Sequence, residues 1–365
     1  MSKENLVVHN VIRKTREENG WSQQELAERS GLSRTGIGAI ESGRLVPSTA
    51  AALALATAFS CRVEDLFILA GKESIQWAWP PLQEPCRYWR ALVGSKQLLY
   101  PVEASPLGTV PHDGVWRDGK CHDHPFADPV RTLVLACCDP AVGLLAAEYA
   151  RQTPFRMLVL PRASRAALNH LSAGRVHAAG IHLGGATSEA GNTQTASELL
   201  AETFHLLRVT DWEEGLALSP GLKAGGINTI LTSGLRWIGR EPGSGARQIF
   251  DEISEGRISP AGLARDHRGV AQVIHSGFAQ AGVSVRLVCE EEGLDFLNIR
   301  KEGYDLCLLD ATMEDPRIRA LIEVVRSSSY RRMLSALPGY ENRQTGDLDS
   351  SQRASAGDIS LPASR

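Results

Sequence analysis

The chain of 365 residues lacks any run of about 18 consecutive apolar residues, the length that a helix needs to cross a bilayer. Its N-terminus also lacks a charged and then apolar leader. The seven cysteines are odd in number and follow no regular spacing, which suits a reducing compartment. We therefore expect a soluble, cytoplasmic protein with no membrane partner.

Excess charge of either sign is also missing. Lys and Arg total 39 while Asp and Glu total 42, which excludes a polybasic coat. The sequence has no Walker loop, no His-Glu-x-x-His and no dinucleotide fingerprint, and residues 243–245 lack the Gly-x-Ser-x-Gly spacing of a nucleophile elbow. These absences predict a protein that is not an enzyme and needs no cofactor.

A helix-turn-helix pattern occupies residues 21–43. Ser22 and Glu25 have the spacing of a capping box at the start of one helix, and Gly31 tolerates the left-handed backbone that ends it. Ser33 caps a second helix, whose two isoleucines recur at the i, i+3 spacing of a buried stripe. The second helix therefore presents its N-terminal turn outward.

Three further helices complete this region in our interpretation. The first includes Leu6, Val7, Val11 and Ile12 and extends to about residue 20. Another opens at Pro47, and a short fifth helix runs from Val63 to Phe67. The region as a whole predicts an all-α domain of five helices within residues 1–71.

Residues 6–69 resemble the phage-repressor family of DNA-binding domains, the Cro, cI or XRE type. The resemblance implies that the second motif helix lies in the major groove of a double-stranded operator, and that Arg16 and Glu41 form a structural pair. The DNA contacts that it implies are Gln23, Ser33, Arg34, Thr35, Ala39 and Arg44. Because acids and bases are equally numerous up to Gly71, we expect binding to depend on specific contacts and on dimerisation.

Residues 72–129 are rich in aromatic residues, proline and glycine, and predict a small β-rich connector that docks onto the next domain. The aromatic side chains are expected to pack rather than to form a ligand cage. One candidate metal patch lies here, since thiol and imidazole ligands at such spacing can hold zinc or copper. Its residues are Cys121, His122, Asp123 and His124, with Cys86 and His112 as distant helpers. Without a second Cys-x-x-Cys or His-x-x-His half, we favour a polar surface loop and no metal.

From residue 130 the pattern alternates between strands and helices, which predicts parallel strands and a ligand site at their carboxyl ends. Expected strands of the second half include residues 206–209, 216–219, 283–288 and 305–309. We interpret Trp212-Glu-Glu-Gly as a turn at a hinge.

Two such α/β lobes resemble the type II periplasmic-binding-protein fold, and residues 130–340 resemble the binding-protein-like domain related to molybdate-binding proteins. The segments that carry this resemblance are 139–145, 174–183, 240–247, 266–271 and 337–340. The last 25 or so residues, 341–365, contain few bulky apolar residues and are predicted to be disordered.

The small residues Gly243, Ser244 and Gly245 open a helix after a strand, so that unpaired backbone N–H groups and a hydroxyl converge on one point. Arg240 and Arg247 flank this loop and complete a clamp for a carboxylate or oxyanion. The alternative is a simple helix cap with solvated arginines. Matching strand ends in the other lobe add further candidate ligand residues. These are Asp139, Arg162, Ser164 and His182. For Asp139 we favour a helix cap over a ligand contact, and His182 equally suits a ligand contact and a buried core histidine.

Together these features predict a ligand-responsive transcription regulator that acts as a homodimer or higher homo-oligomer. A small anion is the expected effector, with molybdate or tungstate favoured because the resemblance implies it. A small carboxylated metabolite remains the rival, favoured by the arginines. The competing class is a DNA-binding protein whose C-terminal domain only dimerises.

Overall fold

The computed structural model describes residues 7–70, 75–103, 109–124, 128–184, 190–222 and 225–351. The chain forms two compact units, residues 1–76 and 77–365. Among the described helices, none combines the length and the apolar character needed to span a membrane.

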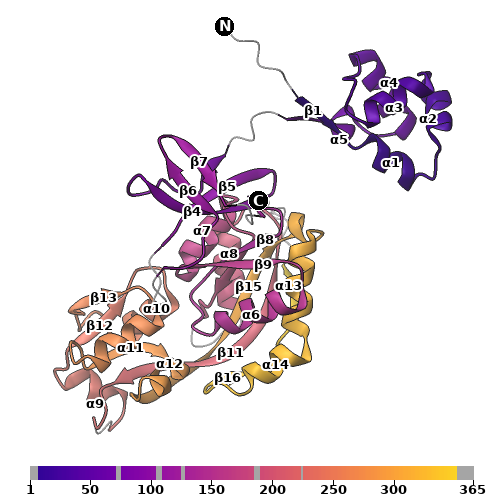
Figure 1. Ribbon diagram of the computed structural model, residues 1–365. Helices are drawn as coiled ribbons and strands as arrows, with labels where there is room; N and C mark the ends of the chain where they lie inside the picture. The colour runs from indigo at the N-terminus through magenta and orange to yellow at the C-terminus, as the bar shows by residue number, and fades with distance from the viewer. Residues whose placement is uncertain are drawn as a thin grey trace, which may run out of the picture. The chain divides into compact units, whose positions relative to one another are not determined.

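The first unit contains five helices within its described residues (Figure 1). They are α1 (Ile12–Glu18), α2 (Gln23–Ser30), α3 (Arg34–Glu41), α4 (Thr49–Phe59) and α5 (Val63–Leu66). Ser22 accepts a hydrogen bond from Glu25 N while the Glu25 side chain accepts one from Ser22 N, so the capping box is complete. Gly31 ends α2 at φ 68°, and Ser33 caps α3. Ile37 and Ile40 are buried, as their spacing predicts.

The ends of this unit differ from the helical prediction. Val7 lies in strand β1 (Val7–Asn10) and Phe67 in strand β2 (Phe67–Ala70), which pair antiparallel. β-branched and aromatic residues suit a strand, and the partner strand is about 60 residues away, so local periodicity could not reveal it. Leu6 lies outside the described residues.

The aromatic-rich segment forms an antiparallel sheet of order β3-β5-β4-β6-β7. Its strands are β3 (Gln76–Trp77), β4 (Cys86–Val93), β5 (Lys96–Pro101), β6 (Gly114–Arg117) and β7 (Lys120–Asp123). Ala91, Leu98 and Tyr100 pack in one core cluster with Val134 and Leu168 of the following α/β region. The Tyr100 hydroxyl also donates a hydrogen bond to Arg175 O at 2.7 Å. The sheet is therefore docked onto that region by its aromatic and apolar side chains.

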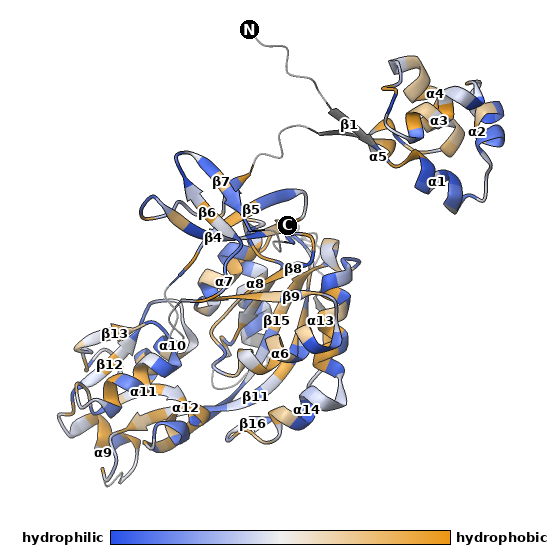
Figure 2. Cartoon of the chain, viewed as in Figure 1, coloured by the Kyte–Doolittle hydropathy of each residue, from blue (hydrophilic) through white to orange (hydrophobic). Residues whose placement is uncertain are grey.

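The α/β region has two lobes (Figure 1). The first lobe contains parallel strands β8 (Thr132–Cys137), β9 (Arg156–Pro161) and β10 (Ala178–Ile181) with helices α6 (Val142–Gln152), α7 (Ser164–Ser172), α8 (Ala190–Leu199), α13 (Pro316–Arg326) and α14 (Ser328–Leu334). The second contains strands β12 (Trp237–Arg240), β13 (Gly262–Ala264) and β14 (Ala281–Val285) with helices α9 (Ile227–Thr232), α10 (Gly245–Ser254), α11 (His267–His275) and α12 (Arg286–Glu291). Figure 2 shows apolar strands in the first lobe between helices whose outer faces are polar.

Two long antiparallel strands join the lobes: β11 (Phe204–Leu218) and β15 (Asp295–Leu309). They make one continuous sheet of order β13-β12-β14-β11-β15-β10-β8-β9. Their pairing shifts register between Arg208 and Thr210 and again between Glu214 and Gly215. Such irregularities locally bend and twist a strand pair, here between the two lobes.

Three sequence predictions for this region were wrong. Residues 206–209 and 216–219 belong to the single strand β11, so Trp212-Glu-Glu-Gly is the middle of a strand and not a turn. The strand expected over 283–288 ends at Val285, where α12 begins. The expected disordered tail is ordered as far as residue 351, because β16 (Tyr340–Glu341) and β17 (Leu348–Ser351) pair with β11. Residues 352–365 lie outside the described residues.

Candidate functional site

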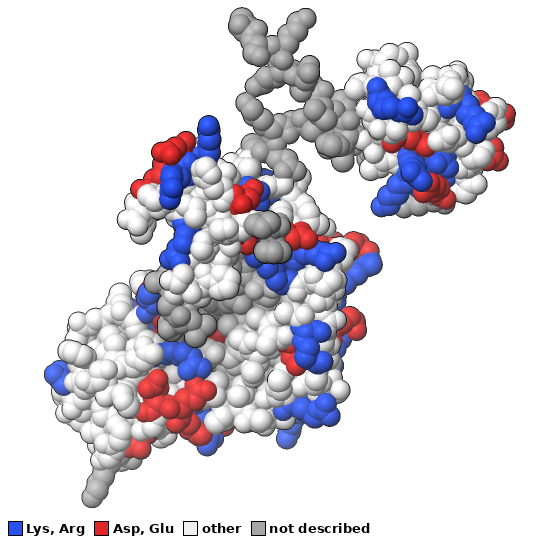
Figure 3. Space-filling model, viewed as in Figure 1, with Lys and Arg blue, Asp and Glu red and all other residues white. Residues whose placement is uncertain are grey.

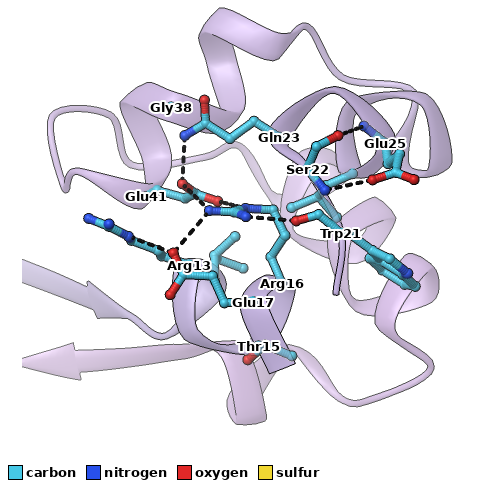
Figure 4. A network of polar contacts seen from close by, with 12 residues as sticks. Arg13, Thr15, Arg16, Glu17, Trp21, Ser22, Gln23, Glu25, Gly38 and Glu41 are labelled. Atoms are coloured by element: carbon cyan, nitrogen blue, oxygen red, sulfur yellow. Dashed lines mark hydrogen bonds and ion pairs between the residues drawn. The ribbon is translucent and has the colours of Figure 1, made fainter. Parts of the chain in front are cut away.

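The helix-turn-helix is held together by a buried polar network around Glu41 (Figure 4). Glu41, the last residue of α3, accepts hydrogen bonds from Arg16 Nε at 2.6 Å and from Gln23 Nε2 at 2.8 Å. Arg16 also donates to Trp21 O at 2.7 Å. The Arg16 and Glu41 side chains are only 10% and 4% exposed. This network fixes α3 against α1 and α2, which is the structural role that the family resemblance implies.

The N-terminal turn of α3 faces solvent. Arg34 and Thr35 are exposed, whereas Ala39 is half-buried. Ser33 is exposed and caps the helix through Gly36 N. Arg44 is exposed and donates to Ser42 Oγ at 2.9 Å. Gln23 is the exception among the predicted contacts, because Glu41 already accepts from its amide. Figure 3 shows acidic and basic side chains interspersed on the visible face of this unit, as the equal numbers in the sequence predict.

A second group of functional side chains lies in a buried layer between the lobes of the α/β region, which we call the interlobe layer. The strand ends and the crossing strands meet there. Its polar members are Cys138 and Asp139 after β8, His182 after β10, Trp212 and Glu214 on β11, Arg240 at the end of β12, His267 at the start of α11, and Glu302 and Tyr304 on β15. All are buried, and none is more than 7% exposed.

Aromatic rings organise the layer around Trp212. Trp212 stacks on Tyr304 with ring centroids 4.8 Å apart. His182 and His267 approach the indole edge-on, with centroids at 4.9 and 5.9 Å. The two imidazoles are themselves 5.4 Å apart. The crossing strand thus brings one histidine from each lobe to the same indole ring.

Carboxylates hold part of this layer in place. His182 Nδ1 is hydrogen-bonded to Glu302 Oε2 at 3.0 Å, and Glu214 Oε2 lies 3.2 Å from the same nitrogen without an aligned hydrogen bond. Asp139 Oδ1 accepts hydrogen bonds from Ala141 N and from the Tyr340 hydroxyl, both at 2.8 Å. Asp139 therefore bonds to the backbone of Ala141 just before α6, although no side chain caps the first turn of that helix.

Several polar atoms of the layer have no hydrogen-bond partner. Trp212 Nε1 and Arg240 Nη1, which can only donate, are among them. His182 Nε2, both ring nitrogens of His267, Asp139 Oδ2 and the oxygens of Glu214 are also unpartnered. Buried polar groups are nearly always hydrogen-bonded, and leaving one unpaired costs about 1 to 3 kcal/mol. The interlobe layer therefore concentrates buried polar atoms that have no hydrogen-bond partner among the described residues.

Burial and neighbouring charges separate the pKa values of the two histidines. Burial lowers the pKa of His182, but the neighbouring Cys138 and Glu214 raise it well above its ordinary value. Burial, Arg240 and His182 together hold the pKa of His267 well below its ordinary value. Burial also raises the pKa of Asp139 to about 6. The pKa values of these two buried imidazoles are therefore shifted in opposite directions.

The two lobes are in direct contact around this layer. Arg165 N donates to Gly243 O at 3.2 Å, and Arg268 Nη2 donates to Pro140 O at 3.4 Å. Gly245 lies directly against His182, since a Cβ atom at this glycine would be 2.5 Å from His182 Nδ1. The structure therefore has its lobes closed over the interlobe layer.

The structure brings some predicted ligand residues together and separates others. Asp139, His182 and Arg240 all belong to the interlobe layer. Ser164 is buried beneath it, and its hydroxyl accepts from His182 N at 3.1 Å, which positions that histidine. The predicted clamp does not form, because Arg247 pairs with Asp251 at 2.8 Å instead of joining Arg240. Arg162 was also misplaced by the prediction, since it pairs with Glu103 and lies over Trp79.

The small-residue loop acts as a helix cap in this structure. Ser244 Oγ accepts from Arg247 N and donates to Glu241 O at 3.0 Å, so its hydrogen-bonding capacity is used locally. Gly243 has φ 87° and borders, with Ser244 and Arg247, a separate cavity of about 380 Å³.

Sequence reasoning missed Trp212, Glu214, Glu302, His267 and Cys138 as members of the layer. Two of these missed residues had a recognisable local signal, since Cys138 directly follows a predicted strand and His267 opens a predicted helix. The others lie mid-strand, where polar residues predict a solvent-facing surface.

The connector patch does not present its ligands together. Cys121 and Asp123 alternate along β7 with His122, so their side chains point to the opposite face of the sheet. Asp123 already accepts hydrogen bonds from Tyr88 at 2.5 Å and from Arg90 at 2.9 Å. His124 instead packs edge-on against His112 at 5.0 Å.

Comparison with known proteins matches both units to families. Residues 12–66 match the helix-turn-helix family, and residues 146–326 match the PBP superfamily domain. The uncharacterized protein YvgK of Bacillus subtilis (strain 168) is 28% identical over 208 residues, which are 54% of this chain and 66% of YvgK. This chain thus spans just under two thirds of the length of that relative.

Two HTH-type transcriptional regulators match the first unit over nearly their whole length. YgzD of Bacillus subtilis (strain 168) is 42% identical over 60 residues, 16% of this chain and 91% of YgzD. A regulator of Methanothermobacter thermautotrophicus is 47% identical over 60 residues, which are 16% of this chain and 87% of that regulator.

Similar solved structures include PhnD1 from Prochlorococcus marinus in complex with methylphosphonate, at 14% identity and a TM-score of 0.42 over 58% of this chain and 92% of PhnD1. The family models and the sequence relatives show that the chain belongs to the helix-turn-helix transcriptional regulators and carries a PBP superfamily domain after its DNA-binding head.

Proposed function

We propose that this protein is a ligand-responsive transcription regulator of the cytoplasm, in which a small anion binds the interlobe layer and alters operator binding by the helix-turn-helix. The observation that carries the proposal is the pair of buried donor-only groups, Trp212 Nε1 and Arg240 Nη1, which lack an acceptor. Arg240 is only 1% exposed. We assign no catalytic step to this site.

The chemistry of these groups favours an acceptor-rich ligand. An indole N–H and a guanidinium can satisfy their hydrogen bonds only with acceptor atoms, and a buried guanidinium gains most from a charged one. His267 lies 5.9 Å from the Trp212 ring and is neutral, so it can donate one further N–H. Burial and the neighbouring Glu302 raise the pKa of Glu214, which reduces the opposing negative charge.

Donors from three separate elements suit a tetrahedral oxyanion, and molybdate or tungstate is the favoured effector. A small carboxylated metabolite is the second candidate, since one guanidinium edge can hold a carboxylate. The third possibility is a domain that binds no effector and serves only for dimerisation.

The response to ligand would arise in the crossing strands. Trp212 and Glu214 lie between the two register shifts of the β11 and β15 pair, where the sheet passes from one lobe to the other. A ligand that contacts both lobes there stabilises the closed form over any open one. In a homodimer that change respaces the two recognition helices, which must lie about 34 Å apart to enter successive major grooves.

Thermal unfolding of the full chain with molybdate, tungstate, sulfate, phosphate and a panel of small carboxylates tests the proposal. A ligand that binds the native state at a hundredfold excess over its dissociation constant stabilises it by about 2.7 kcal/mol. Shifts with molybdate and tungstate alone support the oxyanion effector, and a shift with one carboxylate supports the metabolite. If none of these ligands shifts the midpoint, the result supports a domain that binds no effector and serves only for dimerisation.

Trp212→Phe sharpens this test, because it removes the indole N–H while keeping an aromatic ring against Tyr304. We expect the ligand-induced shift to shrink and basal operator binding to persist. Trp237→Phe is the matched control, since Trp237 is also buried but packs in a different core cluster, in the second lobe. Equal loss in both variants would contradict a direct ligand contact by Trp212.

A further inference from the structure

Three metal-binding side chains converge within the interlobe layer. Cys138 Sγ, a ring nitrogen of His182 and a ring nitrogen of His267 all lie within 4.8 Å of one another. Cys138 is 7% exposed, and both histidines are fully buried. Cys138 and His182 come from the first lobe, whereas His267 opens α11 of the second.

The nitrogens needed for coordination are free. His182 Nε2 and both ring nitrogens of His267 have no hydrogen-bond partner. His182 Nδ1 is bonded to Glu302 Oε2 at 3.0 Å, which leaves Nε2 as the coordinating atom. Arg300 Nε in turn donates to Glu302 at 2.7 Å. Metal-ligating histidines are usually oriented in this way, by a carboxylate on the opposite ring nitrogen.

The layer also holds carboxyl groups that, when ionised, balance the charge of a bound cation. Asp139, Glu214 and Glu302 bring three carboxyl groups into it, and both oxygens of Glu214 lack hydrogen bonds. Arg240 lies in the layer and Arg300 lies at its border. Arg300 also pairs with Glu252 at 2.6 Å. A divalent ion would offset the negative charge that remains when these acids are ionised.

We infer that Cys138, His182 and His267 form a site for a borderline or soft divalent cation of the zinc class. Thiolate and imidazole are the ligands that such ions prefer, and bonds of about 2.0 to 2.3 Å need only side-chain adjustment from the observed spacing. Because the ligands come from both lobes, the ion fastens the closed form. Three protein ligands leave a fourth position open. An oxygen of the anion proposed above would take that position, a step that rests on the proposed function.

Metal titration of the full-length protein tests the site. After removal of metals with a chelator, Zn²⁺ should bind with one equivalent per chain and raise the midpoint of thermal unfolding. Co²⁺ should bind with the absorption bands of a tetrahedral cobalt thiolate. Cys138→Ser should abolish the thiolate band, and Glu302→Gln, which alters a positioning residue, should weaken affinity by about 10- to 100-fold.

Matched variants keep the test decisive. Cys289→Ser changes another buried cysteine and should leave the cobalt spectrum intact, and Cys121→Ser should do the same for the connector patch. His267→Asn, with its fold checked by circular dichroism, gives a second result if Cys138→Ser does not fold. Absence of stoichiometric binding, or binding that Cys138→Ser and His267→Asn leave unchanged, would overturn the inference.

The metal site and the proposed function can fail separately. Anion-induced shifts that persist in chelator-treated protein, combined with no Zn²⁺ binding, would remove the metal site and leave the anion sensor. Zn²⁺ binding at Cys138 without any anion-induced shift would remove the anion sensor and leave the metal site.

Discussion

Glu41 Oε1 and Arg16 Nε lie 2.6 Å apart, and this ion pair joins the last residue of the recognition helix α3 to the first helix α1. Gln23 at the start of α2 donates to the other Glu41 oxygen at 2.8 Å. One carboxylate therefore fixes the orientation of three helices, and the exposed turn at Arg34 depends on it.

Replacing Glu41 by glutamine should loosen the DNA-binding unit. The variant keeps the shape but removes the charge that Arg16 pairs with, which we expect to lower the free energy of opening by about 2 kcal/mol. Amide hydrogens of α1 and α3 should then exchange about 30-fold faster in the full chain. Glu28→Gln is the control, because Glu28 is exposed and bonds only to Gln24 among the contacts described. Similar exchange in both variants would contradict a role for the network.

Arg34→Ala should weaken operator binding selectively. If Arg34 reads a base edge, its loss costs about 1 to 3 kcal/mol and relaxes sequence preference at one position. Arg44→Ala should instead weaken binding to all sequences alike and lower the salt dependence, as expected of a phosphate contact. Binding to an operator selected from a random library, measured at several salt concentrations, distinguishes them. Arg13→Ala, on the exposed surface of α1, should change neither quantity.

Gly245→Ala should prevent lobe closure. Alanine is favoured over glycine within a helix by up to about 1 kcal/mol, so a helix effect alone would stabilise the protein. A Cβ here would meet His182 O at 2.4 Å and His182 Nδ1 at 2.5 Å, so the lobes must separate. We expect a loss of about 1 to 3 kcal/mol in unfolding free energy and loss of the ligand-induced shift.

The control for this glycine is Gly143→Ala on α6, where a Cβ would meet nothing within 4 Å. That variant should be neutral or slightly stabilised. If Gly245→Ala behaves in the same way, then contact between Gly245 and His182 does not govern closure.

Asp139 should make stability depend on pH in a predictable direction. Burial raises its pKa from 3.8 to about 6, so the folded state binds the proton more tightly than the unfolded chain. The protonated form therefore favours folding fully below about pH 4, and this contribution is lost as the pH rises through 6. The shift corresponds to about 3 kcal/mol.

Urea unfolding of the ligand-free chain between pH 4 and 7.5 measures this effect against Asp139→Asn. The asparagine keeps the acceptor for Tyr340 and cannot titrate, so wild type should lose about 2.4 kcal/mol relative to it across that range. A constant difference between the two proteins would show that Asp139 is not the titrating group.

Local rules were sufficient wherever a structural feature depends on neighbours in the chain. Ser22, Gly31 and Ser33 begin and end their helices as predicted, because capping involves backbone groups within about four residues. Local rules failed for Val7, because its strand partner lies near the other end of the unit. The loop at Ser244 was located correctly, but whether its hydroxyl serves a ligand or a helix could not be read from residue types alone.

The sequence by itself determined the helix-turn-helix, the α/β alternation and the exposed recognition turn, because periodicity, capping and turn chemistry act over a few residues. Only the tertiary structure decided the composition of the interlobe layer. Trp212 and Glu302 are 90 positions apart yet oppose each other on β11 and β15, and His182 and His267 come from different lobes. Long-range strand pairing sets which polar side chains lose water together, and that shared burial gives Arg240, His182 and His267 their unpartnered atoms.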